Sequence, residues 1–455
     1  MRKILQSKKL YKGTLYLIIL LLMFSCIAGL ILVTHLSPQE QINTNTTYRT
    51  TSEAASLTWN ITWGGVEYDG GGGVAVDASG NIYCTGTSQS LGDSTGDVVL
   101  IKYNSDGELT WNASWGGDSL FDTGKRSAID KSGNIYCIGD TWSFGAGDCD
   151  LLLVKFAPNG TKLWNVTWGG LWGDSGEGVA VDISGNIYCT GNTLNYGAGG
   201  TDLTLIKFYP DGTKAWNVTW GDLFDDTGND IIVDSSGNIY CTGDLDYMGI
   251  DHELVLVKFN SNGEEVWNST WGGASTDYGK GVTIDPSGDI ICVGTTRSFG
   301  HMFGDLVVIK FNSAGELIWN NTWGGAEADE GKDVAVDIEG NIYCIGDSFS
   351  FGETLGNFVL VKFYPNGIKD WNTTWGGLQE DYGYGVAMDA SGNIICVSET
   401  YSFGDPKGDL AVVSFCCAAG VKEGIPGFEA VWLLFTITAL MAIATWRMTC
   451  KKEWL

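Results

Sequence analysis

The chain has 455 residues, of which 65 are glycine, and its 26 Lys and Arg residues face 54 Asp and Glu residues. Glycine, at about 14%, is twice as common as its usual share of ~7%, and aromatic residues make up 12%. This composition excludes a disordered chain and favours short aromatic strands joined by tight turns. The formal net charge of −28 argues against nucleic-acid binding, which needs clustered cations, and against docking on anionic lipid.

The N-terminal residues 1–36 are basic and contain a long apolar run. Residues 14–33 (TLYLIILLLMFSCIAGLILV) carry no charge, and such a run is long enough to cross ~30 Å of hydrocarbon. The alternative is a cleaved signal peptide, but those usually have a shorter apolar core and a small-residue cleavage site. We expect an uncleaved transmembrane signal-anchor over 1–36, followed by a polar stalk over 37–56.

Three motifs recur seven times through the middle of the chain, at intervals of about 52 residues. The motif W-N-x-[TS]-W begins at Trp59, Trp111, Trp164, Trp216, Trp267, Trp319 and Trp371. The motif D-x-x-G-[ND]-I-[YI]-C begins at Asp77, Asp130, Asp182, Asp234, Asp285, Asp337 and Asp389. An apolar run typified by LVLVKF ends at Tyr103, Phe156, Phe208, Phe259, Phe311, Phe363 and Phe415.

Each repeat predicts four short strands joined by glycine-rich turns, which is typical of a β-propeller blade. The first Trp strand, which begins at Leu57, has no blade before it, and the last blade, which ends at Phe415, lacks its Trp strand. We therefore predict an all-β fold over 57–415, a seven-bladed propeller of four-stranded blades. The N-terminal strand should be the outermost strand of the last blade, so that Leu57 and Phe415 meet and no sheet edge is left open.

The order of the landmarks resembles the SBBP β-propeller repeat. The shared elements are WGG, the D-x-x-G-N-I-Y-C turn and strand, T-x-S-F-G, and LVLVKF followed by a glycine turn back to Trp. The resemblance implies a repeat scaffold on extracellular or surface proteins, and names no substrate or reaction.

The outer strand and the second strand each carry a repeated polar or thiol residue. One cysteine per blade occupies the second strand, and because equivalent positions should lie about 10 Å apart, we expect free buried thiols rather than disulfides. The outer strands carry N-x-[ST] sequons, which are plausible glycan acceptors on an exported domain, although one duplicated strand pattern would also explain them. These asparagines are Asn60, Asn112, Asn165, Asn217, Asn268, Asn320 and Asn372.

A second repeated acid precedes each innermost strand in a D-x-G step. Local turn chemistry explains such a residue, because Asp commonly bonds backbone two residues on. The sharper hypothesis is that seven carboxylates ring the mouth of the axial channel and attract Ca²⁺ or a basic partner. The residues are Asp69, Asp122, Asp174, Asp226, Asp277, Asp329 and Asp381.

The C-terminal end returns to membrane-like composition. We predict a linker over 416–427, a transmembrane helix over 428–446 and a basic cytoplasmic tail over 447–455. The IPGF stretch at 425–428 resembles archaeal PGF-type sorting signals, which would imply removal of this segment and a lipid anchor instead. Because both basic ends should stay cytoplasmic, the propeller should be extracellular, at the cell membrane.

These features predict a membrane-anchored extracellular propeller that acts as a binding or adhesion scaffold for an unknown protein or glycan. The alternatives are a structural component of a surface coat and a propeller enzyme such as a lyase or hydrolase. We expect no catalysis and no cofactor other than possible Ca²⁺, because the sequence contains no Ser-His-Asp, HExxH or phosphate-loop pattern.

Overall fold

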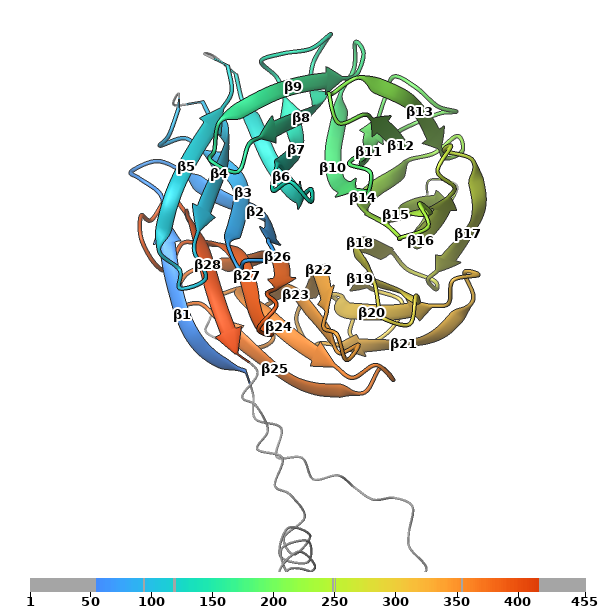
Figure 1. Cartoon of the computed structure of the whole chain (residues 1–455). Coiled ribbons are helices and arrows are strands. Elements are labelled where there is room, and N and C mark those ends of the chain that lie inside the picture. Colours follow the sequence, from blue (N-terminus) through green and yellow to red (C-terminus); the bar gives the residue numbers. More distant parts are fainter. Residues whose placement is uncertain are drawn as a thin grey trace, which may run out of the picture. The chain divides into compact units, whose positions relative to one another are not determined.

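The computed structural model describes residues 55–416, apart from 93–94, 118–119, 248, 250 and 353–354. Seven four-stranded antiparallel sheets stand around a common axis like the blades of a propeller (Figure 1). We number the blades 1 to 7 along the chain, so that blade 1 is β2–β5 and blade 7 is β26–β28 with β1. The predicted all-β, seven-bladed architecture is confirmed.

The strands occupy the same four places in every blade. The innermost strands are β2 (Asp69–Val76), β6 (Asp122–Ile129), β10 (Asp174–Val181), β14 (Asp226–Val233), β18 (Asp277–Ile284), β22 (Asp329–Val336) and β26 (Asp381–Met388). The second strands are β3 (Ile82–Ser88), β7 (Ile135–Thr141), β11 (Ile187–Thr193), β15 (Ile239–Tyr247), β19 (Ile290–Thr296), β23 (Ile342–Ser348) and β27 (Asn393–Thr400). The third strands are β4 (Asp97–Tyr103), β8 (Asp150–Phe156), β12 (Asp202–Phe208), β16 (Asp251–Phe259), β20 (Asp305–Phe311), β24 (Asn357–Phe363) and β28 (Asp409–Cys416). The outermost strands are β5 (Leu109–Trp115), β9 (Lys162–Trp168), β13 (Lys214–Trp220), β17 (Glu265–Trp271), β21 (Leu317–Trp323), β25 (Lys369–Trp375) and β1 (Ser56–Trp63).

The first and last strands of the ring close it together. β1 pairs antiparallel with β28, and Leu57 lies opposite Phe415, as the repeat arithmetic predicted. Figure 1 shows β1 on the outside of blade 7, beyond β28. Pairing extends to Ser56 and Cys416, one residue beyond the predicted limits. The edge of β28 is therefore covered rather than left open to another chain.

The hydrophobic core is divided into clusters that each join two neighbouring blades. Between blades 4 and 5, for example, Leu256 and Trp271 pack with Ile290 and Phe311. The second Trp of each outer strand reaches toward the next blade, so that Trp271 and Phe299 have ring centroids 5.0 Å apart. Blades diverge with distance from the axis, and these large side chains fill the wider outer gap.

The seven blade cysteines are free and buried, as predicted. They lie on the second strands at Cys84, Cys137, Cys189, Cys241, Cys292, Cys344 and Cys396. Burial raises the pKa of the Cys241 thiol to about 12, so these side chains pack as small apolar groups.

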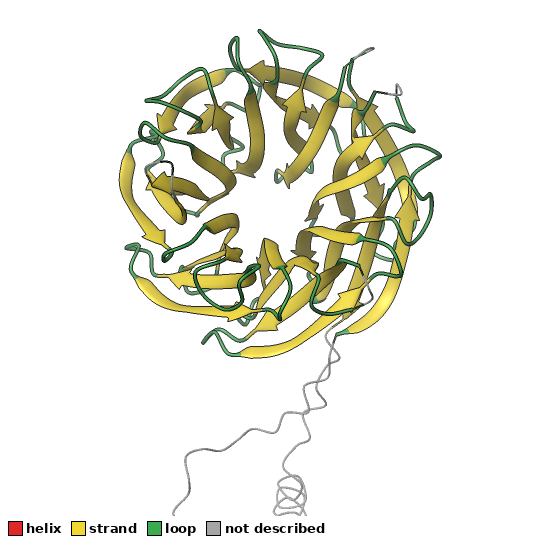
Figure 2. Ribbon diagram, turned by 180° about the vertical axis from the view of Figure 1, so that it is seen from behind, coloured by secondary structure: helices red, strands yellow, loops and turns green. Residues whose placement is uncertain are grey.

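One part of the predicted fold needs correction. The prediction completed the propeller with N- and C-terminal transmembrane helices, but the described residues contain strands and loops only (Figure 2). Among them, no helix is long and apolar enough to cross a membrane. The segments to which the spans were assigned, 1–36 and 428–446, lie outside the described residues, as do the linker beyond Cys416, the basic tail and most of the stalk.

Candidate functional site

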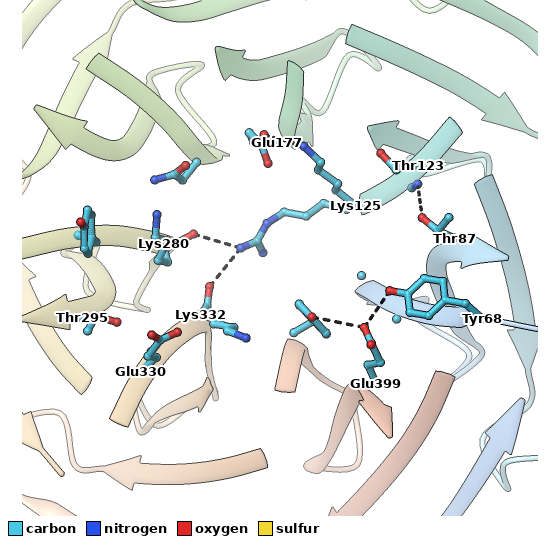
Figure 3. A pocket seen from close by; sticks show the side chains of 18 of the residues that line it. Tyr68, Thr87, Thr123, Lys125, Glu177, Lys280, Thr295, Glu330, Lys332 and Glu399 are labelled. Carbon is cyan, nitrogen blue, oxygen red and sulfur yellow. Dashed lines mark hydrogen bonds and ion pairs between the residues drawn. The ribbon is translucent and has the colours of Figure 1, made fainter. Parts of the chain in front are cut away.

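A pocket of about 590 Å³ opens on the propeller axis. Its wall is formed by the first residues of the innermost strands and the last residues of the second strands, with Tyr68 from the loop before β2 (Figure 3). Arg297, from the loop after β19, also lines it. These loops lie at the end of the blades opposite to Ser56 and Cys416, the first residue of β1 and the last residue of β28. The volume falls within the ~300–1,000 Å³ that small-ligand sites usually have.

A β-bulge in every innermost strand determines which side chains enter this pocket. The pairing register between the first and second strands shifts around the fourth residue of each innermost strand. A bulge re-aims the extra residue away from the regular alternation. The bulged residues all line the pocket: Gly72, Lys125, Glu177, Asn229, Lys280, Lys332 and Tyr384.

The pocket is closed at its inner end by an ion cluster around Arg126. From β6, its guanidinium reaches Asp333 on β22 at 2.9 Å and Asp230 on β14 at 3.5 Å. It also donates to the backbone oxygens of Lys280 and Lys332. A second cavity of about 310 Å³, lined by later residues of the innermost strands, shares Arg126 with the pocket. Arg126 therefore separates two chambers on the axis and ties blades 2, 4 and 6 together.

Most acids behind the pocket wall are neutralised by a lysine at a bulge position. Lys125 lies 2.7 Å from both Asp140 and Glu177. Lys280 and Lys332 pair with Asp244 and Asp347, respectively. Burial raises the pKa of Asp347 to about 6, although Lys332 opposes the shift.

Glu399 is an exception in this ring of acids. It is 4% exposed and lines the pocket, yet it makes no ion pair with any described residue. Instead, the Tyr68 hydroxyl donates to its Oε2 at 2.9 Å and the Tyr384 hydroxyl at 3.4 Å. Figure 3 shows Tyr68 and Glu399 facing one another at the pocket wall. Burial, followed by the negative charge of Glu399, raises the pKa of both tyrosines, so both remain hydrogen-bond donors.

The seven aspartates proposed to bind calcium begin the innermost strands, but none of them lines the axial pocket. Each is almost completely buried and bonds within its surroundings. Asp277, for example, accepts hydrogen bonds from the Thr296 hydroxyl at 2.5 Å and the Gly273 amide at 2.9 Å. Across the described ranges, no three His, Cys, Asp or Glu side chains gather to hold a metal ion. Calcium binding by these residues stays an untested hypothesis beside the turn chemistry.

The predicted glycan acceptors all lie on the outermost strands. Four of these asparagines are exposed, namely Asn60, Asn112, Asn268 and Asn320, and the other three, Asn165, Asn217 and Asn372, are half-buried. Their glycosylation also stays a prediction.

Sequence reasoning missed the residues that make the pocket distinctive. Arg126, Asp230 and Asp333 stand at one repeat position, two residues after the D-x-G glycine, where the other four blades have Gly73, Gly178, Gly281 and Gly385. When the seven repeats are aligned with one another, this position is glycine in four repeats and charged in three, and that difference could have pointed to the site. Glu399 could have been found in the same way, as an acid with no basic residue at the neighbouring bulge positions.

Two stretches of the chain match the SBBP β-propeller repeat. They are residues 168–197 and 323–350, each covering the end of one blade and the start of the next. The match supports the resemblance inferred from the repeated landmarks. The sorting-signal resemblance at 425–428 lies outside the described residues and stays a prediction.

The chain is also 22% identical over 358 residues to an uncharacterized WD repeat-containing protein of Acanthamoeba polyphaga mimivirus. That alignment covers 60% of this chain and 24% of the viral protein, so the chain spans about a quarter of its relative's length.

Solved propellers include enzymes with low similarity to this chain. An ulvan lyase, a polysaccharide lyase, is 13% identical with a TM-score of 0.49, covering 77% of this chain and 95% of the lyase. A gluconolactonase from Xanthomonas campestris is 12% identical with a TM-score of 0.35, covering 63% of this chain and 92% of the lactonase. At these scores the likenesses carry no information about function, and the expected lack of catalysis stays a prediction.

Proposed function

We propose that this protein is an extracellular binding protein whose axial pocket holds a carbohydrate. The observation that carries the proposal is the pocket itself, which is open on the loop face and closed at depth by Arg126. A site of this shape suits the end of a chain rather than a continuous polymer passing through the ring.

The lining supports a polyhydroxylated ligand. Tyr68, Tyr278 and Tyr384 supply aromatic surface with a polar tip, which sugar rings use for stacking and hydrogen bonding. Thr87, Thr123, Thr295 and Asn229 add short polar groups on several sides of the pocket. A few placed polar groups in a concave site fix the orientation of a ligand.

A glycan screen with the purified full-length protein tests this proposal, followed by calorimetric titration of the best ligand. The blocking variant is Thr123→Tyr, because equivalent positions already hold Tyr278 and Tyr382 and should accept the ring. The matched control is Thr213→Tyr, in the exposed turn between β12 and β13 on the other face. We expect the blocking variant to bind about tenfold or more weakly, and the control to bind normally. Absence of any glycan ligand, or equal binding by both variants, would contradict the proposal.

A further inference from the structure

The acids of the second strands can be compared blade by blade, since the ring repeats the same positions. Asp140 and Asp347 take their lysine from the bulge of their own blade, Lys125 and Lys332. Asp244 takes its lysine from the bulge of the next blade, Lys280. Each of these three buried acids is therefore paired with a lysine at the bulge of its own blade or of the next blade.

Glu399 has a cation at neither position. The bulge of its own blade is Tyr384, and the bulge of the next blade is Gly72, which has no side chain. Gly71 and Gly72 both line the pocket, so the wall beside Tyr68 on that blade is bare backbone. A buried carboxylate without a positive partner is costly. Among the described residues, only tyrosine hydroxyls, those of Tyr68, Tyr384 and Tyr401, hydrogen-bond Glu399.

We infer that Glu399, Tyr68 and Tyr384 form a subsite for the protonated amine of an amino sugar. This inference rests on the proposed function, that the axial pocket binds carbohydrate. An ammonium group bound here would take the place of the lysine that the other acids have. It would donate a charge-assisted hydrogen bond to Glu399 and lie near two aromatic rings, which attract cations.

Charge on the larger scale agrees with a cationic ligand. Residues 37–424 contain 18 basic and 52 acidic residues, so the propeller attracts cations from solution. Within the pocket, the lysines at the bulges already have carboxylate partners, whereas Glu399 has none among the described residues. Glu399 is thus the buried acid of the lining that has no cationic partner among the described residues.

The test compares two sugars that differ in the acetylation of their amines, which removes the positive charge. The full-length protein is titrated calorimetrically with chitotriose, the unacetylated glucosamine trimer, and with its fully N-acetylated counterpart. We expect the acetylated trimer to bind about 10- to 100-fold more weakly, the usual range for losing a hydrogen bond to a charged group. Equal affinities would overturn the inference.

Two variants assign the preference to one residue. Glu399→Gln should bind both trimers equally, because the amide keeps the shape but removes the charge. Glu330→Gln, which changes the same charge elsewhere in the pocket lining, should keep the preference. A preference that survives in Glu399→Gln would overturn the inference.

Two further measurements use the wild-type protein, and one comparison separates the inference from the proposed function. Binding of chitotriose to the wild type should weaken as the pH rises through the range in which its amines lose protons, whereas the acetylated trimer should show no such loss. If Nα-acetyl-lysine methylamide competes better than chitotriose, the assignment to an amino sugar is wrong. If a neutral glycan binds in a way that Thr123→Tyr blocks, with no preference for amines, the proposed function stands and the amine subsite does not.

Discussion

Replacing Arg126 by glycine should destabilise the protein more than the loss of one partly exposed side chain usually does. The change removes a guanidinium that lies 2.9 Å from Asp333 and 3.5 Å from Asp230. Both aspartates are buried, at 8% and 6% exposure, and would keep no cationic partner on the axis. Breaking a buried ion pair on one side costs about 3–5 kcal/mol. Because 20% of the Arg126 side chain remains exposed, we expect a loss near the lower end, about 3 kcal/mol.

The triple variant Arg126→Gly, Asp230→Gly and Asp333→Gly should recover about a third of that loss. It gives all seven blades the glycine that four of them already have. The remaining loss of stability comes from two hydrogen bonds. Asp230 accepts one from the backbone amide of Val282, and Asp333 accepts one from the backbone amide of Val386. Each such bond is worth about 1 kcal/mol, so the triple variant should lie about 2 kcal/mol below the wild type.

The assay is urea unfolding of the full-length protein followed by tryptophan fluorescence.

The destabilisation by Arg126→Gly should also depend on pH. Burial raises the pKa of Asp230, against the lowering effect of Arg126. A carboxyl with a raised folded pKa favours folding below its unfolded pKa, and this contribution is lost as the pH rises through the folded pKa. Loss of Arg126 raises that pKa further, so the single variant should be penalised less near pH ~5 than near pH ~8.

Breaking the exposed Lys407–Glu67 pair by Lys407→Ala is the control, expected to cost about 0–1 kcal/mol. The reasoning fails if the single Arg126 variant behaves like this control, or if the triple variant is no more stable than the single one.

Three further predictions concern repeated residues. Iodoacetamide near pH ~8 should alkylate the seven blade cysteines only after denaturation, because burial raises their thiol pKa values. Rapid labelling of the native protein, read by mass spectrometry, would contradict the packing of these side chains. Asp277→Asn should lower the free energy of unfolding in urea by about 1–3 kcal/mol through its lost hydrogen bonds, and millimolar Ca²⁺ should leave the melting temperature of the wild type unchanged. A Ca²⁺-induced rise in the melting temperature that the variant abolishes would establish cation binding. Peptide mapping of protein from a glycosylating host should find glycans at exposed Asn112 and Asn320 more often than at half-buried Asn217; the reverse order would show that accessibility in the folded state does not govern occupancy.

Repetition explains which parts of the fold could be predicted from the sequence. Residues that recur in every blade, such as the Trp pair and the blade cysteines, report packing that every blade shares. Their order around the ring also required Leu57 to meet Phe415, and the structure pairs them. Local spacing was sufficient because each blade folds from neighbouring segments.

The candidate site depends instead on positions at which the repeats differ. Arg126 contacts residues more than 100 positions away, and no local spacing shows that the bulges of separate blades converge on one pocket. The repeated Asp277 and its equivalents drew attention as carboxylates, yet their role in the structure is to bond neighbouring turns. Residues that recur in every blade form the propeller fold, and residues that differ between blades determine the chemistry of the axial pocket.

Hydrogen exchange of the full-length protein, measured by mass spectrometry with and without chitotriose, tests most directly whether the axial pocket is the binding site. The expected result is slower exchange at the pocket wall, in peptides that contain residues 68–72 and 384–399, with no change in the outermost strands. Protection confined to outer strands such as β5 and β17, with the axial peptides unchanged, would contradict the proposal that the protein binds its ligand on the axis.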